Sequence, residues 1–246
     1  EQQLEEYLKQ VLPQVKGVVL SDYGSGTITD KLLGQIFAYC QEHNIPTIVD
    51  SRYDILRFKT VDYIKQNDAE LSAAIGRDLA TEEELVQGGC ELLVKMSAKG
   101  ALITRGEDGM SLFQIISPQE AADYLKSQEV SGSGEAGQFR EGLTVKLVVK
   151  RQTGRLSVVQ ELISYQDRDI LVSHIPVTDK SEVYDVSGAG DTCVATVILG
   201  LAAGLEPLLA CQLSNEASGI AVRKMGTSVV YARELEARFR QLGYEA

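Results

Sequence analysis

Short apolar runs alternate with amphipathic segments through the first half of the chain. Four of these runs have the composition of strands buried on both faces of a sheet: residues 17–20, 46–50, 61–64 and 101–104. After a candidate N-cap at Thr29, apolar residues recur at helical spacing: Leu32, Leu33, Ile36, Phe37 and Cys40. Thr81 precedes a second helical segment that begins with three glutamates. This order of strands and helices predicts a three-layer α/β/α sandwich with a mostly parallel sheet.

Polar or glycine-containing residues follow each of the four runs, at residues 22–24, 50–52, 67–70 and 104–109. In a parallel sheet the carboxyl ends of the strands lie along one edge, and ligands bind there. Each group taken alone is more typical of an ordinary loop with solvated charges. Their common position at one edge favours a phosphate and metal site.

A glycine-rich motif, Asp-Val-Ser-Gly-Ala-Gly-Asp, occupies residues 185–191 directly before a small-residue helix predicted over residues 192–204. Such glycines let the backbone approach an anion closely, and the N–H groups at a helix start point toward that anion. Asp191 stands where a carboxylate could accept a proton from an alcohol that attacks a phosphoryl group. A glycine-rich turn and an N-cap are the alternative that this motif alone leaves open.

Residues 117–181 have a different pattern. They comprise a helical segment over 118–128, a glycine- and serine-rich stretch over 131–137, and two alternating runs over 143–149 and 156–163. The two runs predict a β-hairpin that turns at Thr153 and Gly154. We interpret this region as an added hairpin subdomain that covers the substrate site or forms a subunit contact. A tolerated surface insertion is the alternative.

Composition narrows the class of protein. The chain has 246 residues, 44% of them hydrophobic, which suits one globular domain over residues 1–246. Its net charge of −11 argues against nucleic acid or an anionic membrane as a partner. The four cysteines lack the spacing of a zinc site, and no apolar run reaches the length of a membrane span. We therefore expect a cytoplasmic protein whose cysteines are reduced.

Three motifs resemble those of the PfkB, or ribokinase-like, carbohydrate kinases. Residues 185–191 resemble the C-terminal signature of that family, with Val186 where Thr is commoner. Residues 67–70 resemble its Asn-x-x-Glu motif, and residues 104–109 its Thr-x-Gly-x-x-Gly nucleotide loop. Within the family, the chain resembles the bacterial heptose 7-phosphate kinases at residues 20–24, 104–110, 183–186 and 224–227. The resemblance implies a ribokinase-type kinase that uses ATP and Mg²⁺ to phosphorylate a hydroxyl of a phosphorylated sugar, heptose 7-phosphate above all.

The resemblance also implies roles for individual residues. Asp191 would be the catalytic base, beside an anion hole formed by the N–H groups of Gly188, Ala189 and Gly190. Asn67 and Glu70 would organise the hydrated magnesium ion. The expected nucleotide contacts are Thr104, Arg105, Gly106, Gly109, Asn215, Gly219 and Lys224. Asp22 and Asp185 are the expected substrate contacts, although a strand-end turn is an equal alternative for Asp22.

Several departures from the family pattern bear on the substrate. Family members carry a longer N-terminal segment with a β lid over the sugar, and this chain begins inside that segment, as a fragment or as a form without the lid. Residues 117–181 stand where the family has a short β connection, Ser51-Arg52 replaces Pro-Lys, and Lys65-Gln66 replaces Thr-Pro. The remaining alternatives are a kinase for another sugar or nucleoside, and a non-catalytic nucleotide- or sugar-binding regulator or scaffold. A homodimer is the candidate assembly.

Overall fold

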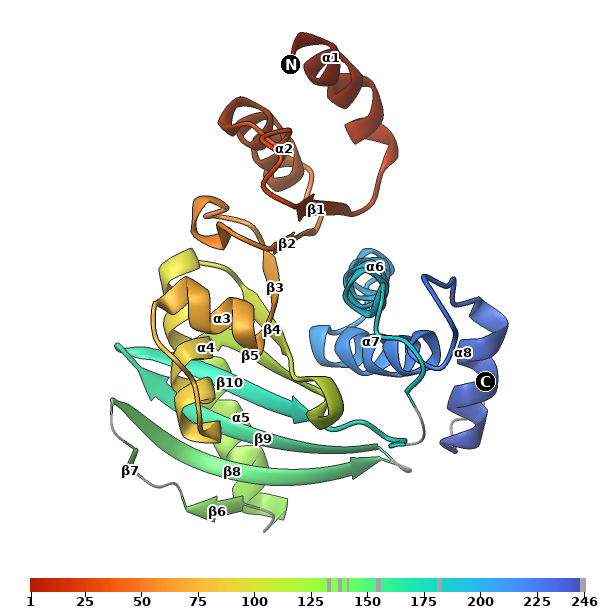
Figure 1. Cartoon of the computed structure of the whole chain (residues 1–246). Helices are drawn as coiled ribbons and strands as arrows, with labels where there is room; N and C mark the ends of the chain where they lie inside the picture. Colours follow the sequence, from red (N-terminus) through yellow and green to blue (C-terminus); the bar gives the residue numbers. More distant parts are fainter. Residues whose placement is uncertain (132–133, 137–138, 141, 154–155, 181–182, 244–246) are drawn as a thin grey trace.

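One large sheet organises the computed structural model, which describes residues 1–131, 134–136, 139–140, 142–153, 156–180 and 183–243 (Figure 1). Within these residues the sheet has ten strands: nine follow the order β1-β2-β3-β4-β5-β10-β9-β8-β6, and β7 lies off this path and pairs with β8. The strands are β1 (Val18–Asp22), β2 (Thr47–Ser51), β3 (Tyr63–Asn67), β4 (Gly100–Thr104), β5 (Met110–Ile116), β6 (Gly134–Ala136), β7 (Phe139–Arg140), β8 (Leu143–Thr153), β9 (Leu156–Tyr165) and β10 (Arg168–Ile175).

Eight α-helices lie in the part of the chain that the structure describes (Figure 1). They are α1 (Gln2–Val11), α2 (Asp30–Glu42), α3 (Asp68–Ile75), α4 (Glu82–Met96), α5 (Pro118–Ser131), α6 (Ala189–Ala202), α7 (Pro207–Ala221) and α8 (Ala232–Gln241). None of these described helices is both long and apolar enough to cross a bilayer.

The first four strands of the sheet, which correspond to the four predicted apolar runs, are parallel. β1 to β4 pair in the same direction, with Leu20 opposite Val49 and Ile64 opposite Ala101. β5 returns antiparallel to β4, and the described pairings from β5 to β6 are also antiparallel. The sheet is therefore mixed, and its parallel half gathers the carboxyl ends of four strands at one edge.

Alternating strand residues decide which helices cover each face of the sheet. Val49, Ile64 and Ile103 belong to a core that includes side chains of α2, α3 and α4. Their chain neighbours Ile48 and Leu102 belong to a second core with α6 and α7. Successive side chains of a strand point to opposite faces, so a strand that is apolar throughout needs helices on both sides. The predicted three-layer α/β/α sandwich is confirmed.

Side-chain caps begin two of the predicted helices. The Thr29 hydroxyl oxygen accepts the N–H of Leu32 at the start of α2 (3.4 Å). At α4, Thr81 and Glu84 form a capping box, in which each side chain accepts the backbone N–H of the other residue at 3.2 and 2.9 Å. Each cap of this kind stabilises a helix by about 1 kcal/mol, which explains why both starts could be predicted locally.

The region that we interpreted as an insertion continues the central sheet. β8 and β9 form the predicted antiparallel hairpin, β9 pairs with β10, and β10 pairs with β5. β8 ends at Thr153, and Gly154 of the predicted turn lies outside the described residues, as do residues 132–133 and 137 of the glycine- and serine-rich stretch. The helix predicted over residues 118–128 is α5, which continues to Ser131.

Candidate active site

The carboxyl ends of the four parallel strands lie close to the start of α6. The last residues of these strands are Asp22, Ser51, Asn67 and Thr104. α6 begins at Ala189 after Gly188, whose φ of 77° belongs to the left-handed region that favours glycine. No side chain caps this helix. An uncapped helix start has backbone N–H groups available for an anion.

Asp191 lies in the first turn of α6, where its carboxylate faces the loop after β1. The hydroxyl of Tyr23 approaches Oδ1 of Asp191 at 3.4 Å. Tyr23 follows Asp22 at the end of β1, so two segments that are far apart in sequence meet at the predicted base. The structure thus places Asp191 at the strand-end edge, as the motif predicted.

A lysine that the sequence analysis noted only as a departure from the family pattern lies at the centre of this edge. Lys65 of β3 is 5% exposed, and its Nζ lies 3.0 Å from Oδ2 of Asp50 and 3.9 Å from Oε2 of Glu70. A Cβ built on Gly190 would lie 3.2 Å from the same Nζ. The ammonium group therefore lies directly beside Gly190, in the first turn of α6.

Burial is the largest influence on the pKa of both partners in this ion pair. It raises the pKa of Asp50, and Glu70 and Asp191 raise it further, while Lys65 lowers it. Burial alone would lower the pKa of Lys65, but the carboxylates of Asp50 and Glu70 outweigh it and the pKa is raised. Lys65 therefore keeps its proton, and it brings one fixed positive charge to a group of three carboxylates.

The predicted anion hole is only partly available in this conformation. The N–H of Ala189 donates to the carbonyl oxygen of Val186 at 3.2 Å within the motif itself. For the N–H groups of Gly188 and Gly190, no acceptor is recorded among the described residues. The geometry therefore offers two of the three predicted amides, together with the ammonium of Lys65, to an anion at this position.

A cavity of about 330 Å³ extends from Gly190 to the predicted nucleotide loop. It is lined by seven of the predicted site residues: Thr104, Gly106, Gly109, Ala189, Gly190, Asn215 and Gly219. At Gly219 an added Cβ would meet nothing within 4 Å, so the wall there is open. At Gly109, with φ of 87°, a Cβ would lie 2.1 Å from the carbonyl oxygen of Ile175, so only glycine fits.

Two predicted nucleotide contacts do not line this cavity. Arg105 forms a forked ion pair with Glu82, with Nη1 2.9 Å from Oε1 and Nη2 bonded to Oε2. Lys224 donates to the carbonyl oxygen of Val229 at 2.7 Å and to Glu234 at 2.8 Å. Both cations already have acceptors in this structure, so the expected contacts of Arg105 and Lys224 with the nucleotide stay predictions.

The predicted metal ligands cap a helix. Oδ1 of Asn67 accepts the N–H of Glu70 at 2.7 Å, and Oε2 of Glu70 accepts the N–H of Asn67 at 2.8 Å, which forms a capping box at α3. No group of three or more His, Cys, Asp or Glu side chains in the described ranges is arranged to hold a metal. Mg²⁺ usually retains several waters and takes one or two carboxylates. The second oxygen of Glu70 fits that limited role, and a closed protein cage is not present among the described residues.

The predicted substrate contacts are engaged in local structure. Asp22 is 5% exposed, and its carboxylate accepts the Gly24 N–H at 3.1 Å and the Ser51 hydroxyl at 2.9 Å. These are the contacts of a strand-end turn, the alternative that we weighed equally. Asp185 accepts the N–H groups of Ser187 (2.8 Å) and Gly226 (3.0 Å), and its pKa is lowered chiefly by the Ser187 N–H. Asp185 thus joins the motif to the loop after α7.

Three site residues were missed as candidates by sequence reasoning. Lys65 occupies a position where the family usually has Thr, and that replacement was the available signal. Tyr23 was noticed only as part of a motif, and Arg223, which lines the cavity, carried no signal of its own. Each depends on contacts between segments that are distant in sequence.

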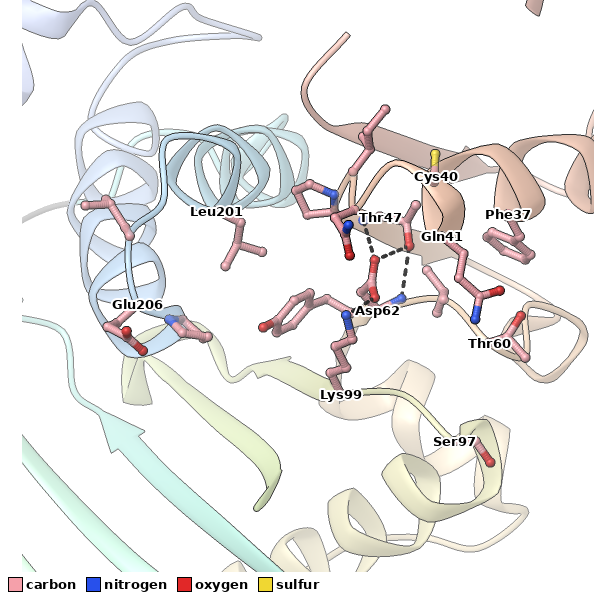
Figure 2. Close-up of a pocket in the computed structure, with 17 residues that line it drawn as sticks. Phe37, Cys40, Gln41, Thr47, Thr60, Asp62, Ser97, Lys99, Leu201 and Glu206 are labelled. Atoms are coloured by element: carbon pink, nitrogen blue, oxygen red, sulfur yellow. Dashed lines mark hydrogen bonds and ion pairs between the residues drawn. The ribbon is translucent and has the colours of Figure 1, made fainter. Parts of the chain in front are cut away.

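A second, larger cavity of about 630 Å³ lies at the opposite edge of the parallel strands (Figure 2). Thr47, Asp62 and Lys99, at the amino ends of β2, β3 and β4, line it. Figure 2 shows their contacts, in which Asp62 accepts the N–H and the hydroxyl of Thr47, each at 2.9 Å, and lies 2.8 Å from Nζ of Lys99. None of the predicted site residues lines this cavity, so the smaller one is the candidate active site.

Known proteins that resemble this chain are carbohydrate kinases and bifunctional proteins. Residues 1–131 and 162–232 match the family described as pfkB family carbohydrate kinase. The bifunctional protein HldE of Rhodospirillum rubrum is 30% identical over 228 residues, and that of Hyphomonas neptunium is 31% identical over 244 residues. These matches cover 92% and 99% of this chain but 35% and 39% of the relatives. The chain thus spans little more than a third of the curated relatives that it matches.

Solved structures show the same fold at lower identity. Phosphofructokinase-2 from Escherichia coli, in complex with potassium, matches with a TM-score of 0.62 and 18% identity, over 99% of this chain and 62% of that one. Ribokinase from Arabidopsis thaliana, complexed with ribose and ATP, matches with a TM-score of 0.59 and 16% identity, over 96% and 58%. The predicted ribokinase-type fold is confirmed. Together with the sequence match, these findings show that the chain belongs to the pfkB family of carbohydrate kinases.

Proposed function

We propose that this chain transfers the γ-phosphoryl group of ATP to a hydroxyl of a phosphorylated sugar, with heptose 7-phosphate as the favoured acceptor. One observation carries the proposal: Gly190, which lines the smaller cavity, lies beside the Lys65 ammonium and precedes Asp191. A positive charge, uncapped amides and a carboxylate are the three elements that transfer of a phosphoryl group requires. The choice of acceptor is supported by the motifs shared with heptose 7-phosphate kinases.

Asp191 acts as the base in this proposal. Its carboxylate accepts the proton of the acceptor hydroxyl, whose oxygen forms a bond to the γ-phosphorus while the bond to the bridging oxygen of ADP breaks. Tyr23 lies 3.4 Å from Oδ1 and holds the carboxylate in one orientation. Charge on the transferring group is stabilised by the N–H groups of Gly188 and Gly190 and by the Lys65 ammonium. Ala189 joins this hole if its bond to Val186 opens.

The nucleotide lies along the cavity between the loop after β4 and α7. Thr104, Gly106 and Gly109 border the phosphates, while Asn215 and Gly219 border the base. Asn215 is held in place by its amide, which donates to the carbonyl oxygen of Pro176 at 2.9 Å. Arg105 and Lys224 support the surrounding loops through the ion pairs described above. We place this reaction in the cytoplasm. All four cysteines are free thiols, as is usual for proteins of that reducing compartment.

Magnesium fits this site as a largely hydrated ion near Glu70. When bound, it would neutralise charge on the nucleotide phosphates. Oε2 of Glu70 caps α3, so Oε1 is the oxygen that would hold the ion, and Asn67 fixes the position of this carboxylate through the capping box. Lys65, 3.9 Å from Glu70, limits the negative charge that this carboxylate presents.

Measurement of ADP release with a panel of sugar phosphates, including heptose 7-phosphate, tests the proposal. The Asp191→Asn variant keeps the shape of the side chain and removes its basicity, so we expect turnover to fall by roughly 10²- to 10⁴-fold. Asp78→Asn is the matched control, because Asp78 is exposed and lies outside the cavity. Equal turnover in wild type and Asp191→Asn would refute the base assignment. Nucleotide binding without turnover for any acceptor would favour the non-catalytic alternative.

A further inference from the structure

A buried carboxylate on α7 lies outside the machinery described above. Glu216 is 3% exposed, and it adjoins Asn215, which lines the nucleotide cavity. Its Oε1 accepts the hydroxyl of Thr178 and its Oε2 accepts Nε of Arg238, each at 2.7 Å. Nη2 of Arg238 also donates to the Thr178 oxygen at 2.7 Å. The three side chains therefore form a closed ring of short hydrogen bonds, two of them to a buried charge.

This ring joins three separate segments of the chain. Glu216 belongs to α7, Arg238 to α8, and Thr178 to the strap, which we define as residues 176–180 between β10 and the glycine-rich motif. Val177 and Asp179 of the strap line the nucleotide cavity, as does Asn215 of α7. The ring thus connects the strap and α7, which both line the cavity, although none of its three side chains lines the cavity itself. Arg238 of α8 provides the cation of the ring.

A second connection runs from α8 to the cavity itself. Oδ2 of Asp179 lies 3.7 Å from Nη1 of Arg238 and 3.0 Å from Nη2 of Arg223, which also donates to the Asp179 carbonyl oxygen at 3.0 Å. Arg223 lines the cavity, and its Nε is buried without a hydrogen-bond partner among the described residues. An unsatisfied buried donor is costly, so this end of the network gains from any rearrangement that supplies an acceptor.

We propose that Arg238 is a positioning residue for the nucleotide cavity, so that docking of α8 and binding of the nucleotide stabilise each other. This proposal rests on the proposed function, because it takes a nucleotide as the occupant of the cavity. Arg238 acts through Glu216, Thr178 and Asp179 rather than by touching the ligand. Without its cation, Glu216 is left as a buried charge with one partner fewer, and the strap loses its attachment to α8 through Thr178 and Asp179.

The proposal can be measured both as a change in nucleotide affinity and as a change in the docking of α8, because the coupling between the two is reciprocal. If docked α8 favours nucleotide binding, bound nucleotide must favour docked α8 by the same factor. Couplings of this kind typically change affinity by roughly 5- to 150-fold. A purely structural role for Arg238 predicts a less stable protein but no response of α8 to the nucleotide.

The test uses the full chain with ADP as the probe. Hydrogen–deuterium exchange over Ala232–Gln241 is measured with and without ADP, and calorimetric titration gives the Kd of ADP for each variant. We expect ADP to slow exchange in α8 of the wild type, and we expect Arg238→Met to abolish that protection and raise the Kd by about 5-fold or more. Arg240→Met, an exposed change on the same helix, serves as the control and should match the wild type.

A second variant, Thr178→Val, keeps the proposal testable if Arg238→Met does not fold. It keeps the shape of the side chain while removing the hydroxyl that bonds to both Glu216 and Arg238. We expect it to raise the Kd in the same direction by a smaller factor. An unchanged Kd in Thr178→Val, or no protection of α8 by ADP in the wild type, would overturn the proposal while leaving the proposed function intact. Failure of the wild type to bind ADP would overturn both, and it would be seen before any variant is compared.

Discussion

Lys65 and Asp50 form an ion pair across the neighbouring parallel strands β3 and β2, with 3.0 Å between Nζ and Oδ2. Their Cα atoms are register partners, and their side chains are 6% and 17% exposed. The pairing directs the ammonium toward Gly190 at the start of α6. A cation near a helix N-terminus is normally disfavoured by the helix dipole. Its presence here is explained by the surrounding carboxylates and by the anion that we propose for this position.

We expect Lys65→Met to impair both turnover and stability. Loss of one charge-stabilising donor should lower kcat by roughly 10²- to 10³-fold. Removal of one partner of a buried pair should also lower the free energy of unfolding by about 3–5 kcal/mol. The double variant Asp50→Asn/Lys65→Met removes both charges, so it should regain most of the stability and remain slow. ADP release and urea unfolding measure the two effects separately.

Lys99 provides the matched control for this prediction. It pairs with Asp62 at 2.8 Å, but at the opposite edge of the same strands and with its side chain 74% exposed. Exposed pairs contribute at most about 1 kcal/mol, so Lys99→Met should leave kcat unchanged and alter stability little. Unchanged kcat in Lys65→Met as well would contradict a phosphoryl contact by Lys65.

The fork between Arg105 and Glu82 predicts that Arg105 acts through the loop rather than on the phosphates. We expect Arg105→Met and Glu82→Gln to raise the Kd of ATP by similar factors, and we expect the double variant to add little to either change. Calorimetric titration of the four proteins gives the cycle. A much larger loss of affinity in Arg105→Met than in Glu82→Gln would show instead that the guanidinium binds phosphate directly.

Close packing at Gly89 predicts a strong asymmetry between two Gly→Ala changes in helices. In α4, a Cβ at Gly89 would lie 2.3 Å from Cζ of Phe113, which is fully buried. Such overpacking should destabilise the protein by about 1–3 kcal/mol. In α2, a Cβ at Gly34 meets nothing within 4 Å, so Gly34→Ala should stabilise by about 0.4–1 kcal/mol. Urea unfolding followed by circular dichroism compares the two, and equal effects would contradict this packing.

Burial of the cysteines predicts how the protein responds to thiol reagents and to alkaline pH. Burial raises the pKa of Cys40 to about 11 and of Cys90 to about 12, and it also raises the pKa values of Cys193 and Cys211. All four thiols are free and buried, so alkylation at pH 8 should follow unfolding rather than precede it. Rapid labelling of any thiol in the folded protein would contradict this.

The same shifts set the sign of a pH effect on stability. A thiol whose pKa is higher in the folded state than the ordinary 9.0 holds its proton when the unfolded chain has lost it. The contribution of these thiols is therefore fully present below pH 9 and decreases as the pH rises toward 11 and 12. Urea unfolding across this range should show a falling free energy of unfolding, and variants with Cys90→Ala should show a smaller slope.

The parallel half of the fold, and which polar residues lie at its edge, could be predicted from local patterns. Apolar runs, the caps at Thr29 and Thr81, and the motif that ends in Asp191 each act over a few residues, so the chain carries their signals directly. The hairpin of β8 and β9 was visible for the same reason, because alternation has a period of two residues. Its continuity with the central sheet was not, since that depends on pairing between β10 and β5.

Contacts between distant segments decided the rest of the site. Lys65 of β3 reaches Gly190 because the folded chain brings the end of this strand next to the first turn of α6, and Arg105 faces Glu82 because the predicted nucleotide loop packs beside the start of α4. Charged side chains with long, flexible stems can reach several partners, and which partner they take depends on the position of the backbone that carries them. The motifs and their order thus indicated the family and predicted a base at Asp191, whereas only the packing of strands against α4 and α6 decided which cations lie near the anion site that we propose.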